Sequence, residues 1–226
     1  MGRLLSGFSD RTWLGLSIDP ASAADSLTFP NNACASWSTG IGPNIACANS
    51  SFINQSYGDT ASVNVTYQDV IAPPGTTLRW WDTDYNNLVG VAWGTGGDAN
   101  SHARIEIDPL GTDSVTLNSL DLGAWPNTSR DTNLQVKDLS TNTILFSFTG
   151  AVGVQPANTA THFNINVTSA NGLAIEWFNS AFNVGIDNID FTVAAVSGVP
   201  EPSTYAFILG LALAGMTYAR RRASRS

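Results

Sequence analysis

Hydrophobic residues in this chain recur at every second position over several short stretches. In HARIEIDPL, residues 102–110, Ala103, Ile105 and Ile107 fall on one side of an extended chain and charged residues fall on the other. Successive side chains of a strand point to opposite faces of a sheet, so this alternation predicts a half-buried β-strand. The same period recurs in SVNVTY, SVTLNS, NLQVKD, ILFSFTG, HFNINVTS and LAIEWF. These stretches restrict most of the chain to an all-β fold.

Turn-forming residues separate the predicted strands. They cluster at Pro73-Pro74-Gly75, Gly94 to Gly97, Pro109 to Gly111, Pro126-Asn127 and Asn171-Gly172. Roughly ten short strands, with no convincing helix between them, predict an antiparallel β-sandwich of jelly-roll type. We place this domain at residues 24–198, since a chain of 226 residues suits one domain with short signals at its ends.

The chain ends in three parts of different chemistry: the motif VPEP at 199–202, a short hydrophobic helix predicted at 205–219, and a basic tail at 220–226. The two prolines of the motif hold an extended segment that a protease can reach. Fifteen helical residues span roughly 23 Å, which is less than the ~30 Å hydrocarbon core of a bilayer. The basic tail favours the cytoplasmic side and leaves the preceding domain outside. The helix is either a temporary membrane segment or an ordinary single-pass anchor.

This ending resembles the PEP-CTERM sorting signal of Gram-negative bacteria. The resemblance rests on Val199, Pro200, Glu201 and Pro202, on the apolar helix, and on Arg220, Arg221 and Arg222. It implies that an exosortase recognises and cleaves the signal, in organisms that make exopolysaccharide and biofilm matrix. It also implies export, transient anchoring in the inner membrane through the C-terminal helix, and a final place at the cell surface or in the extracellular matrix.

The N-terminus carries half of an export signal. Ala21-Ser22-Ala23 has the small-residue spacing of a signal-peptidase site. Asp10, Arg11 and Asp19 interrupt the apolar segment that should precede such a site. Residues 1–23 are therefore either a signal peptide that is truncated or has a misassigned start, or a disordered leader.

Cys34 and Cys47 are the only cysteines, and they lie in a stretch rich in Gly, Asn and Ser. In an exported protein this pair predicts a disulfide. Closing a loop of about 14 residues would stabilise the fold by roughly 3 kcal/mol, because it restricts the unfolded chain. The alternative is two free thiols.

The body of the chain is acidic. Residues 24–199 hold 15 Asp and Glu against four Lys and Arg, a net charge of −11. Such a surface repels the phosphates of nucleic acid and disfavours anionic membranes. We therefore expect no nucleic-acid partner.

One polar segment, TLRWWDTDYNN, is rich in aromatic residues. Flat rings beside carboxylates and amides suit a sugar, whose CH face stacks on a ring while its hydroxyls bond to polar groups. Period two makes one of the adjacent Trp80 and Trp81 a core residue, and Leu78, in phase with Trp80, favours Trp81 as the exposed ring. The same pattern favours burial of Trp93 and Trp177. The glycan-binding candidates are Trp80, Trp81, Asp82, Asp84, Tyr85 and the loop residue Trp125.

The last predicted strand changes phase. In NVGIDNIDFTV, Val184 and Ile186 alternate in one phase and Ile189 and Phe191 in the other, which predicts a β-bulge near Asp187. The Asp187 carboxylate would then cap backbone amides or bind a cation, and a structural calcium ion is one hypothesis. No other cofactor is expected. The stretch is similar to the final strand of carbohydrate-binding jelly-roll domains, including those in PEP-CTERM proteins, where an Asp-Asn pair precedes an apolar strand.

No catalytic motif stands out. His102 and His162 are the only histidines, and neither G-x-S-x-G nor H-E-x-x-H occurs. A glycosidase needs two carboxylates, but carboxylates on the polar face of a strand are usually only solvated. The available carboxylates are Asp82, Asp84, Glu106 and Asp108. We therefore expect no enzyme and assign no catalytic residue.

Together these features predict an exported, exosortase-processed protein of the cell surface or matrix that binds an extracellular polysaccharide. A structural matrix or adhesion protein without a defined ligand is the alternative. A secreted glycan hydrolase is a lesser one.

Overall fold

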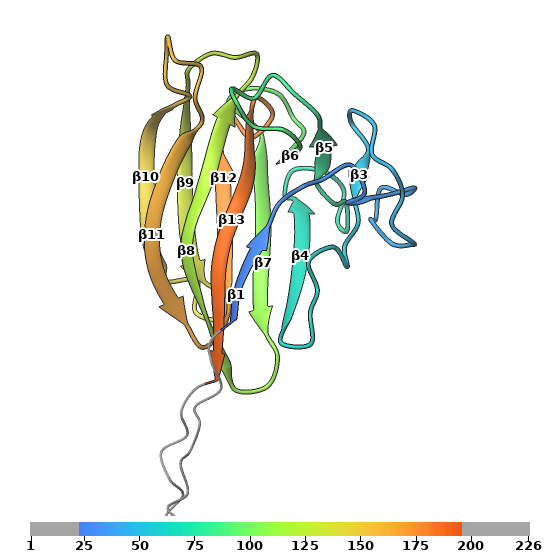
Figure 1. The fold of residues 1–226 in the computed structure, drawn as a ribbon, viewed down its shortest axis with the longest axis vertical. Helices are drawn as coiled ribbons and strands as arrows, with labels where there is room; N and C mark the ends of the chain where they lie inside the picture. Colours follow the sequence, from blue (N-terminus) through green and yellow to red (C-terminus); the bar gives the residue numbers. More distant parts are fainter. Residues whose placement is uncertain (1–22, 196–226) are drawn as a thin grey trace, which may run out of the picture.

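The structure, a computed structural model, describes residues 23–195. Within this range thirteen β-strands form two antiparallel sheets and there is no helix (Figure 1). The prediction of an all-β sandwich is therefore confirmed. The helix predicted at 205–219, the sorting motif and the signal-peptide segment before Ala23 lie outside the described residues.

The first sheet has eight strands. Its central strand β13 (Val184–Ala195) pairs with β8, β6 and β1, so the last strand of the domain lies between segments that are far apart in the sequence. The other members, in the order in which they pair outward from β13, are β8 (Asp113–Ala124) and β11 (Thr161–Ser169) on one side, β6 (Val91–Trp93), β5 (Arg79–Trp81), β3 (Phe52–Ile53) and β2 (Cys34–Ala35) on the other, and β1 (Ala23–Leu27) beside β13.

The second sheet has five strands, and β12 (Leu173–Phe178) is its centre. Ile175 of β12 faces Ile105 of β7 on one side and Val136 of β9 on the other, so apolar residues meet across three neighbouring strands. The remaining bounds, in sheet order, are β10 (Ile144–Val152), β9 (Arg130–Asp138), β7 (His102–Pro109) and β4 (Val63–Asp69).

The predicted alternation is visible in the burial of single strands. In β4 every second side chain is buried, beginning with Val63, and in β7 the residues Ala103, Ile105 and Ile107 are buried while their neighbours are more exposed. The buried faces of the two sheets meet in one large core. Trp177 is the largest fully buried side chain of this core, and its indole Nε1 donates a hydrogen bond to the Val184 carbonyl oxygen at 2.8 Å.

Cys34 and Cys47 are joined by a disulfide, which confirms the pairing expected from the sequence. The bond closes the loop that follows β2, and the Cys34 side chain belongs to the core. The bond thus attaches an otherwise irregular loop to the sandwich.

The phase change in the last strand is also confirmed. The pairing register between β13 and β8 shifts between Asp187 and Asp190. Asp187 is buried, and its Oδ1 accepts a hydrogen bond from the Phe29 backbone amide at 3.2 Å, which is the capping role that the sequence left open. Burial raises the pKa of Asp187 to about 7, although the backbone amides of Asn188 and Phe29 act in the opposite direction. Within residues 23–195, no group of three or more His, Cys, Asp or Glu side chains could hold a metal ion.

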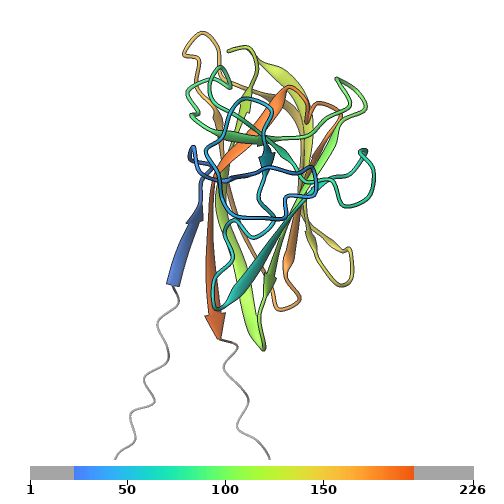
Figure 2. The ribbon, with the colours of Figure 1, turned by 90° about the vertical axis from the view of Figure 1, so that its right-hand side faces the viewer.

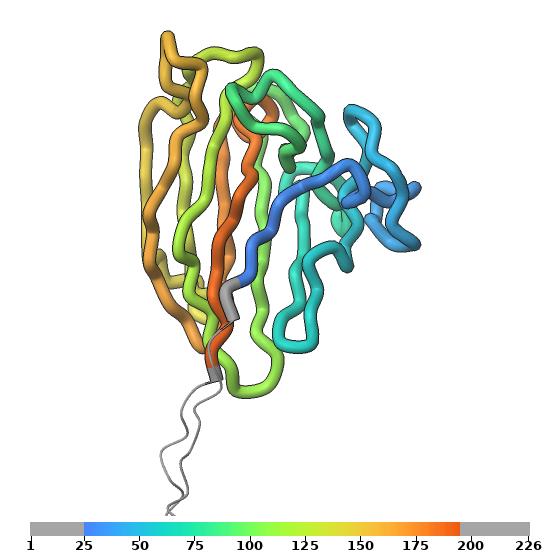
Figure 3. The backbone as a smooth tube through the Cα atoms, in the orientation of Figure 1, coloured from blue at the N-terminus to red at the C-terminus, as the bar shows by residue number. Residues whose placement is uncertain are grey.

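Both ends of the described chain lie at the same end of the sandwich. Ala23 at the start of β1 pairs with Val193 near the end of β13 (Figures 2 and 3). In Figure 1, β8 ends and β13 begins at the opposite end. Residues 23–195 contain no helix long and apolar enough to cross a membrane.

Candidate ligand-binding site

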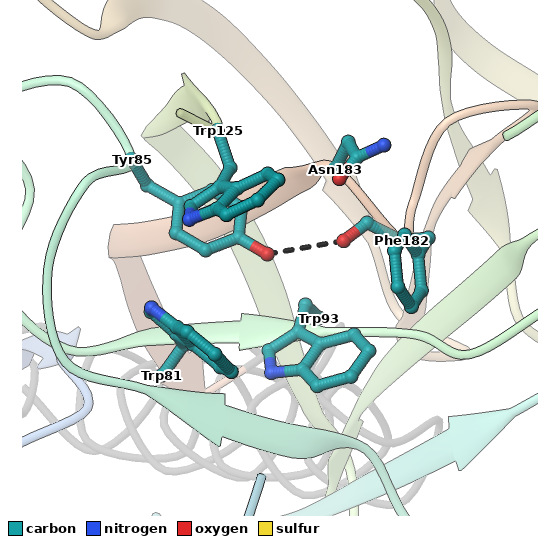
Figure 4. A pocket seen from close by; sticks show the side chains of 6 residues that line it. All are labelled: Trp81, Tyr85, Trp93, Trp125, Phe182 and Asn183. Atoms are coloured by element: carbon teal, nitrogen blue, oxygen red, sulfur yellow. Dashed lines mark hydrogen bonds between the residues drawn. The ribbon is translucent and has the colours of Figure 1, made fainter. Parts of the chain in front are cut away.

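A small aromatic pocket lies on the outer face of the first sheet, near the end from which β13 starts. Period two places Trp80 and Ala92 toward the core, so Trp81 and Trp93 point to the other face of strands β5 and β6. The cavity has a volume of about 80 Å³. The pocket is lined by Trp81, Tyr85, Trp93, Trp125, Phe182 and Asn183 (Figure 4).

Edge-to-face contacts join three of these rings into one wall. Trp81 and Trp93 meet with their ring centroids 6.3 Å apart and their planes at 77°. Trp93 and Phe182 meet at 5.3 Å and 87°. Such contacts are favourable because the positive edge of one ring faces the negative face of the other. They bring the β5–β6 pair together with the loop that precedes β13.

Tyr85 lies on the connection between β5 and β6, which folds back over the end of β8. The Tyr85 hydroxyl donates a hydrogen bond to the Phe182 carbonyl oxygen at 3.0 Å. Burial raises the pKa of Tyr85 well above its usual value, so the hydroxyl stays a protonated donor. A side chain at Gly123 would place its Cβ 2.2 Å from the Tyr85 carbonyl oxygen, so this close approach requires glycine.

Asn86 fixes the same connection against two other segments. Its side-chain Oδ1 accepts a hydrogen bond from the Ala124 backbone amide at 2.6 Å. Its Nδ2 donates to the Thr128 carbonyl at 3.1 Å and to the Asn158 side chain at 3.0 Å. The buried amide is thus fully engaged in holding the loop rather than in facing a ligand.

A polar network positions Trp125 and Asn183. The Trp125 backbone amide donates to the Asn183 carbonyl oxygen at 2.8 Å, and the Trp125 carbonyl accepts from Arg130 Nε at 2.6 Å. Arg130 also forms an ion pair with Asp98 at 2.9 Å, and Asp98 accepts a hydrogen bond from Asn183 Nδ2 at 2.6 Å. The two residues are therefore held in place by each other and by Arg130 and Asp98, which do not line the pocket.

The three indole groups of the pocket have no hydrogen-bond acceptor within residues 23–195. Trp93 Nε1 is buried without a partner, and Figure 4 shows the nitrogen-bearing edge of Trp93 turned toward Trp81. An N–H that faces a π-system gains a weak interaction only. The lining of the pocket is thus almost wholly apolar, and it leaves few polar groups available to a bound molecule.

The structure brings three of the six predicted residues together at this pocket: Trp81, Tyr85 and Trp125. Trp80 lies elsewhere, in the main core, where it is 3% exposed and donates its Nε1 hydrogen to the Phe29 carbonyl at 2.7 Å. Asp82 and Asp84 are exposed beside the pocket and do not line it. As the strand pattern favoured, Trp80 is buried and Trp81 is the more exposed member of the pair.

Sequence reasoning missed Trp93, Phe182 and Asn183 as pocket residues. Trp93 is buried, as its phase indicated, but it is buried in a second apolar cluster on the outer face and not in the main core. Phe182 and Asn183 belong to a short connection between β12 and β13 that carries no motif. Nothing in their local sequence marks them as neighbours of Trp81.

The four carboxylates considered above as catalytic groups of a glycosidase do not line the pocket, and neither do the two histidines. Glu106 contacts Arg104 at 2.6 Å on the outer face of the second sheet, and Asp108 is exposed. Beside them the buried Glu176 contacts Arg104, Lys137 and His102. The hydrogen bond to His102, with further help from Lys137, lowers the pKa of Glu176 to about 2. On the other sheet, His162 contacts Asp121 at 2.7 Å.

The C-terminal residues match a known protein-sorting motif. The family model of the PEP-CTERM protein-sorting motif matches residues 198–222. The chain carries an exosortase sorting signal. This match supports an exported protein that exosortase processes, as the sequence predicted from VPEP and the terminal arginines. A search of the curated proteins gave no match to the chain.

Proposed function

We propose that this exported, exosortase-processed protein binds glycans without catalysis, through the aromatic pocket on β5 and β6. The observation that carries the proposal is the convergence of Trp81, Tyr85 and Trp93, from one stretch of the chain, with Trp125, which follows β8, on one accessible cavity. Aromatic faces stack on the CH faces of sugars, and concave apolar sites with a few polar groups are typical of ligand binding. Trp81 and Trp125 are both partly exposed and are the stacking rings in this proposal.

The strand order supports the more specific interpretation of the fold as a jelly roll. The strands β6, β13, β8 and β11 follow one another in the first sheet, and β7, β12, β9 and β10 follow one another in the second. From β7 onward the chain therefore crosses repeatedly between the sheets, as two interleaved Greek keys require. In this interpretation β1 to β5 are additions to an eight-stranded sandwich.

The position of the pocket supports a surface or matrix location. Asn183 directly precedes β13, and the sorting signal follows the far end of the same strand. Twelve residues of extended chain cover roughly 40 Å. We infer that the signal is held transiently at the inner membrane and that the pocket then faces away from it, toward extracellular polysaccharide.

The charge of the domain restricts the ligand. A net charge of −11 in residues 24–199 repels glycans that carry carboxylates, sulfates or phosphates. Asp82, Asp84 and Asp98 lie on the segments that surround the pocket and add to this repulsion. The polysaccharide partner in this proposal is therefore neutral or basic.

A glycan-array screen of the purified full-length chain, followed by isothermal titration of the best ligand, tests the proposal. We expect Trp125→Ala to weaken binding by about 1–3 kcal/mol, the range for removing an aromatic anchor. Trp37→Ala is the matched control, because Trp37 is 71% exposed on the disulfide loop and does not line the pocket. Equal losses in both variants would contradict the proposed site. Absence of any bound glycan would favour the structural or adhesion role, and release of sugar from the ligand would favour the hydrolase.

A further inference from the structure

The orientation of one buried amide gives the pocket a specific polar group. Asn183 is 7% exposed, and its Nδ2 donates to Asp98 at 2.6 Å. A carboxylate can only accept, so the nitrogen must face Asp98 and the oxygen must face the other way. Figure 4 shows this oxygen, Oδ1, on the side of the pocket. It has no hydrogen-bond donor within residues 23–195, and Asn183 is one of the residues that line the cavity.

The pocket also offers hydrogen-bond donors. Trp81 and Trp125 each line the cavity, and neither indole N–H has an acceptor among the described residues. The Tyr85 hydroxyl is already bonded to the Phe182 carbonyl oxygen. Asn183 Oδ1 and the indole N–H groups of Trp81 and Trp125 are thus polar groups of the lining residues that have no partner within residues 23–195, and the lining is otherwise almost wholly carbon.

This inventory does not suit a whole sugar ring. Ligand pockets usually measure about 300–1,000 Å³, whereas this cavity measures about 80 Å³. A hexose ring would bury several hydroxyls, and each one left without a hydrogen-bond partner would weaken binding. The cavity is therefore suited to one small substituent, while the ring to which it is attached stays at the rim.

We propose that the pocket binds the acetamido group of an N-acetylated amino sugar. The methyl group would lie among the rings of Trp81, Trp93 and Trp125. The amide N–H would donate to Asn183 Oδ1, and the amide C=O would accept from an indole N–H of Trp81 or Trp125. This proposal rests on the glycan binding proposed above and names the sugar class that the site selects.

A cationic substituent is the main competitor, because aromatic rings also attract ammonium groups. Two indole N–H groups without acceptors, on residues that line the same cavity, oppose a cation, because the N–H edge is the positive end of each ring. An acetamide, in contrast, supplies an acceptor to them and a donor to Asn183. The acetamido group therefore matches the polar groups of the pocket better.

The test compares ligands that differ only in this substituent. The full-length chain is titrated with the tetramers of N-acetylglucosamine, glucosamine and glucose. We expect the N-acetylated tetramer to bind at least about tenfold more tightly than either of the others, because sites that hydrogen-bond a group reject ligands that lack it. Equal affinity for the N-acetylated and glucose tetramers would overturn the acetamido proposal and leave glycan binding intact. Tighter binding of the glucosamine tetramer would overturn it in favour of a cation. Absence of binding to these tetramers and to every glycan on the array would overturn both proposals.

A protein variant provides a second readout. Asn183→Leu removes the acceptor, so we expect the preference for the N-acetylated tetramer to disappear while weak binding of the glucose tetramer remains. Asn133→Leu, on the other sheet and outside the pocket, is the matched control and should keep the preference. Thermal unfolding of each variant verifies that it folds. A preference that survives in folded Asn183→Leu would overturn the role of Asn183, and if that variant does not fold the ligand series alone decides.

Discussion

Strands β5 and β6 have two apolar faces that serve different purposes. On the inner face Trp80 joins the main core, and its indole N–H is bonded to the Phe29 carbonyl oxygen. On the outer face Trp81 and Trp93 form a second cluster in which the indole N–H groups have no acceptor within residues 23–195. The inner face is complete by itself, as a stable core requires. The outer face has unused donors and a cavity, which is typical of a binding surface.

Adjacent residues can therefore have opposite roles. Trp80 and Trp81 have the same chemistry and differ only in the direction in which the pleat of β5 points them. If this comparison holds, substitutions on the inner face should act on stability, and substitutions on the outer face should act on binding. Substitutions at Trp80, Asp187 and Trp81 test this difference between the two faces.

The largest effect is expected for Trp80→Ala. Removing this buried ring leaves a cavity in the core and the Phe29 carbonyl without its donor, so the free energy of unfolding should fall by about 3–5 kcal/mol. Urea unfolding of the variant and its parent measures the loss. A loss below about 1 kcal/mol would show that the core repacks around the missing ring.

The second prediction concerns Asp187, the buried carboxyl group that holds Phe29. Its pKa of about 7 lies above the value of 3.8 expected for the unfolded chain. A raised pKa means that folding favours the protonated form of the Asp187 carboxyl group. The contribution of this group to the free energy of unfolding is therefore fully present below pH 4 and is lost as the pH rises through 7. The loss amounts to at most about 4 kcal/mol, from roughly 1.4 kcal/mol per pKa unit.

Asp187→Asn keeps an oxygen that can accept from the Phe29 amide and removes the titration. We expect the variant to gain stability relative to its parent between pH 4 and pH 8, with the difference largest at pH 8. Urea unfolding at several pH values gives this difference directly. A difference that is constant over the range would mean that Asp187 does not titrate there, and that the inner face is less sealed from water than its burial indicates.

The smallest effect on stability is expected for Trp81→Ala. The ring is partly exposed and contacts Trp93 at its edge, so the melting temperature should change little while glycan affinity falls by about 1–3 kcal/mol. Calorimetric titration and thermal unfolding are measured on the same preparation. If Trp81→Ala instead lost as much stability as Trp80→Ala without a change in affinity, the outer cluster would be a second core and not a binding surface.

The disulfide and the bulge show which features short sequence patterns can predict. Cys34 and Cys47 are the only cysteines, so the pairing followed from their number and from the export signal. The phase change around Asp187 predicted a bulge, because a strand cannot keep both apolar sets on one face without an extra residue. Whether the Asp187 carboxylate would cap amides or bind a cation could not be read from the strand, because the capped amide belongs to Phe29, 158 residues away.

Features that depend on a short stretch of residues could be predicted from the sequence. The period of two predicted the strands, and Leu78 indicated that Trp80 rather than Trp81 turns inward. The motif and the arginines near the C-terminus predicted the sorting signal. The pocket, in contrast, depends on how the strands are arranged in space. Its walls come from Trp81, from Trp125 directly after β8, and from Asn183 before β13, and these residues meet because strands from distant parts of the chain lie side by side. A local pattern specifies which face a side chain takes, but the neighbours on that face depend on how the two sheets are connected.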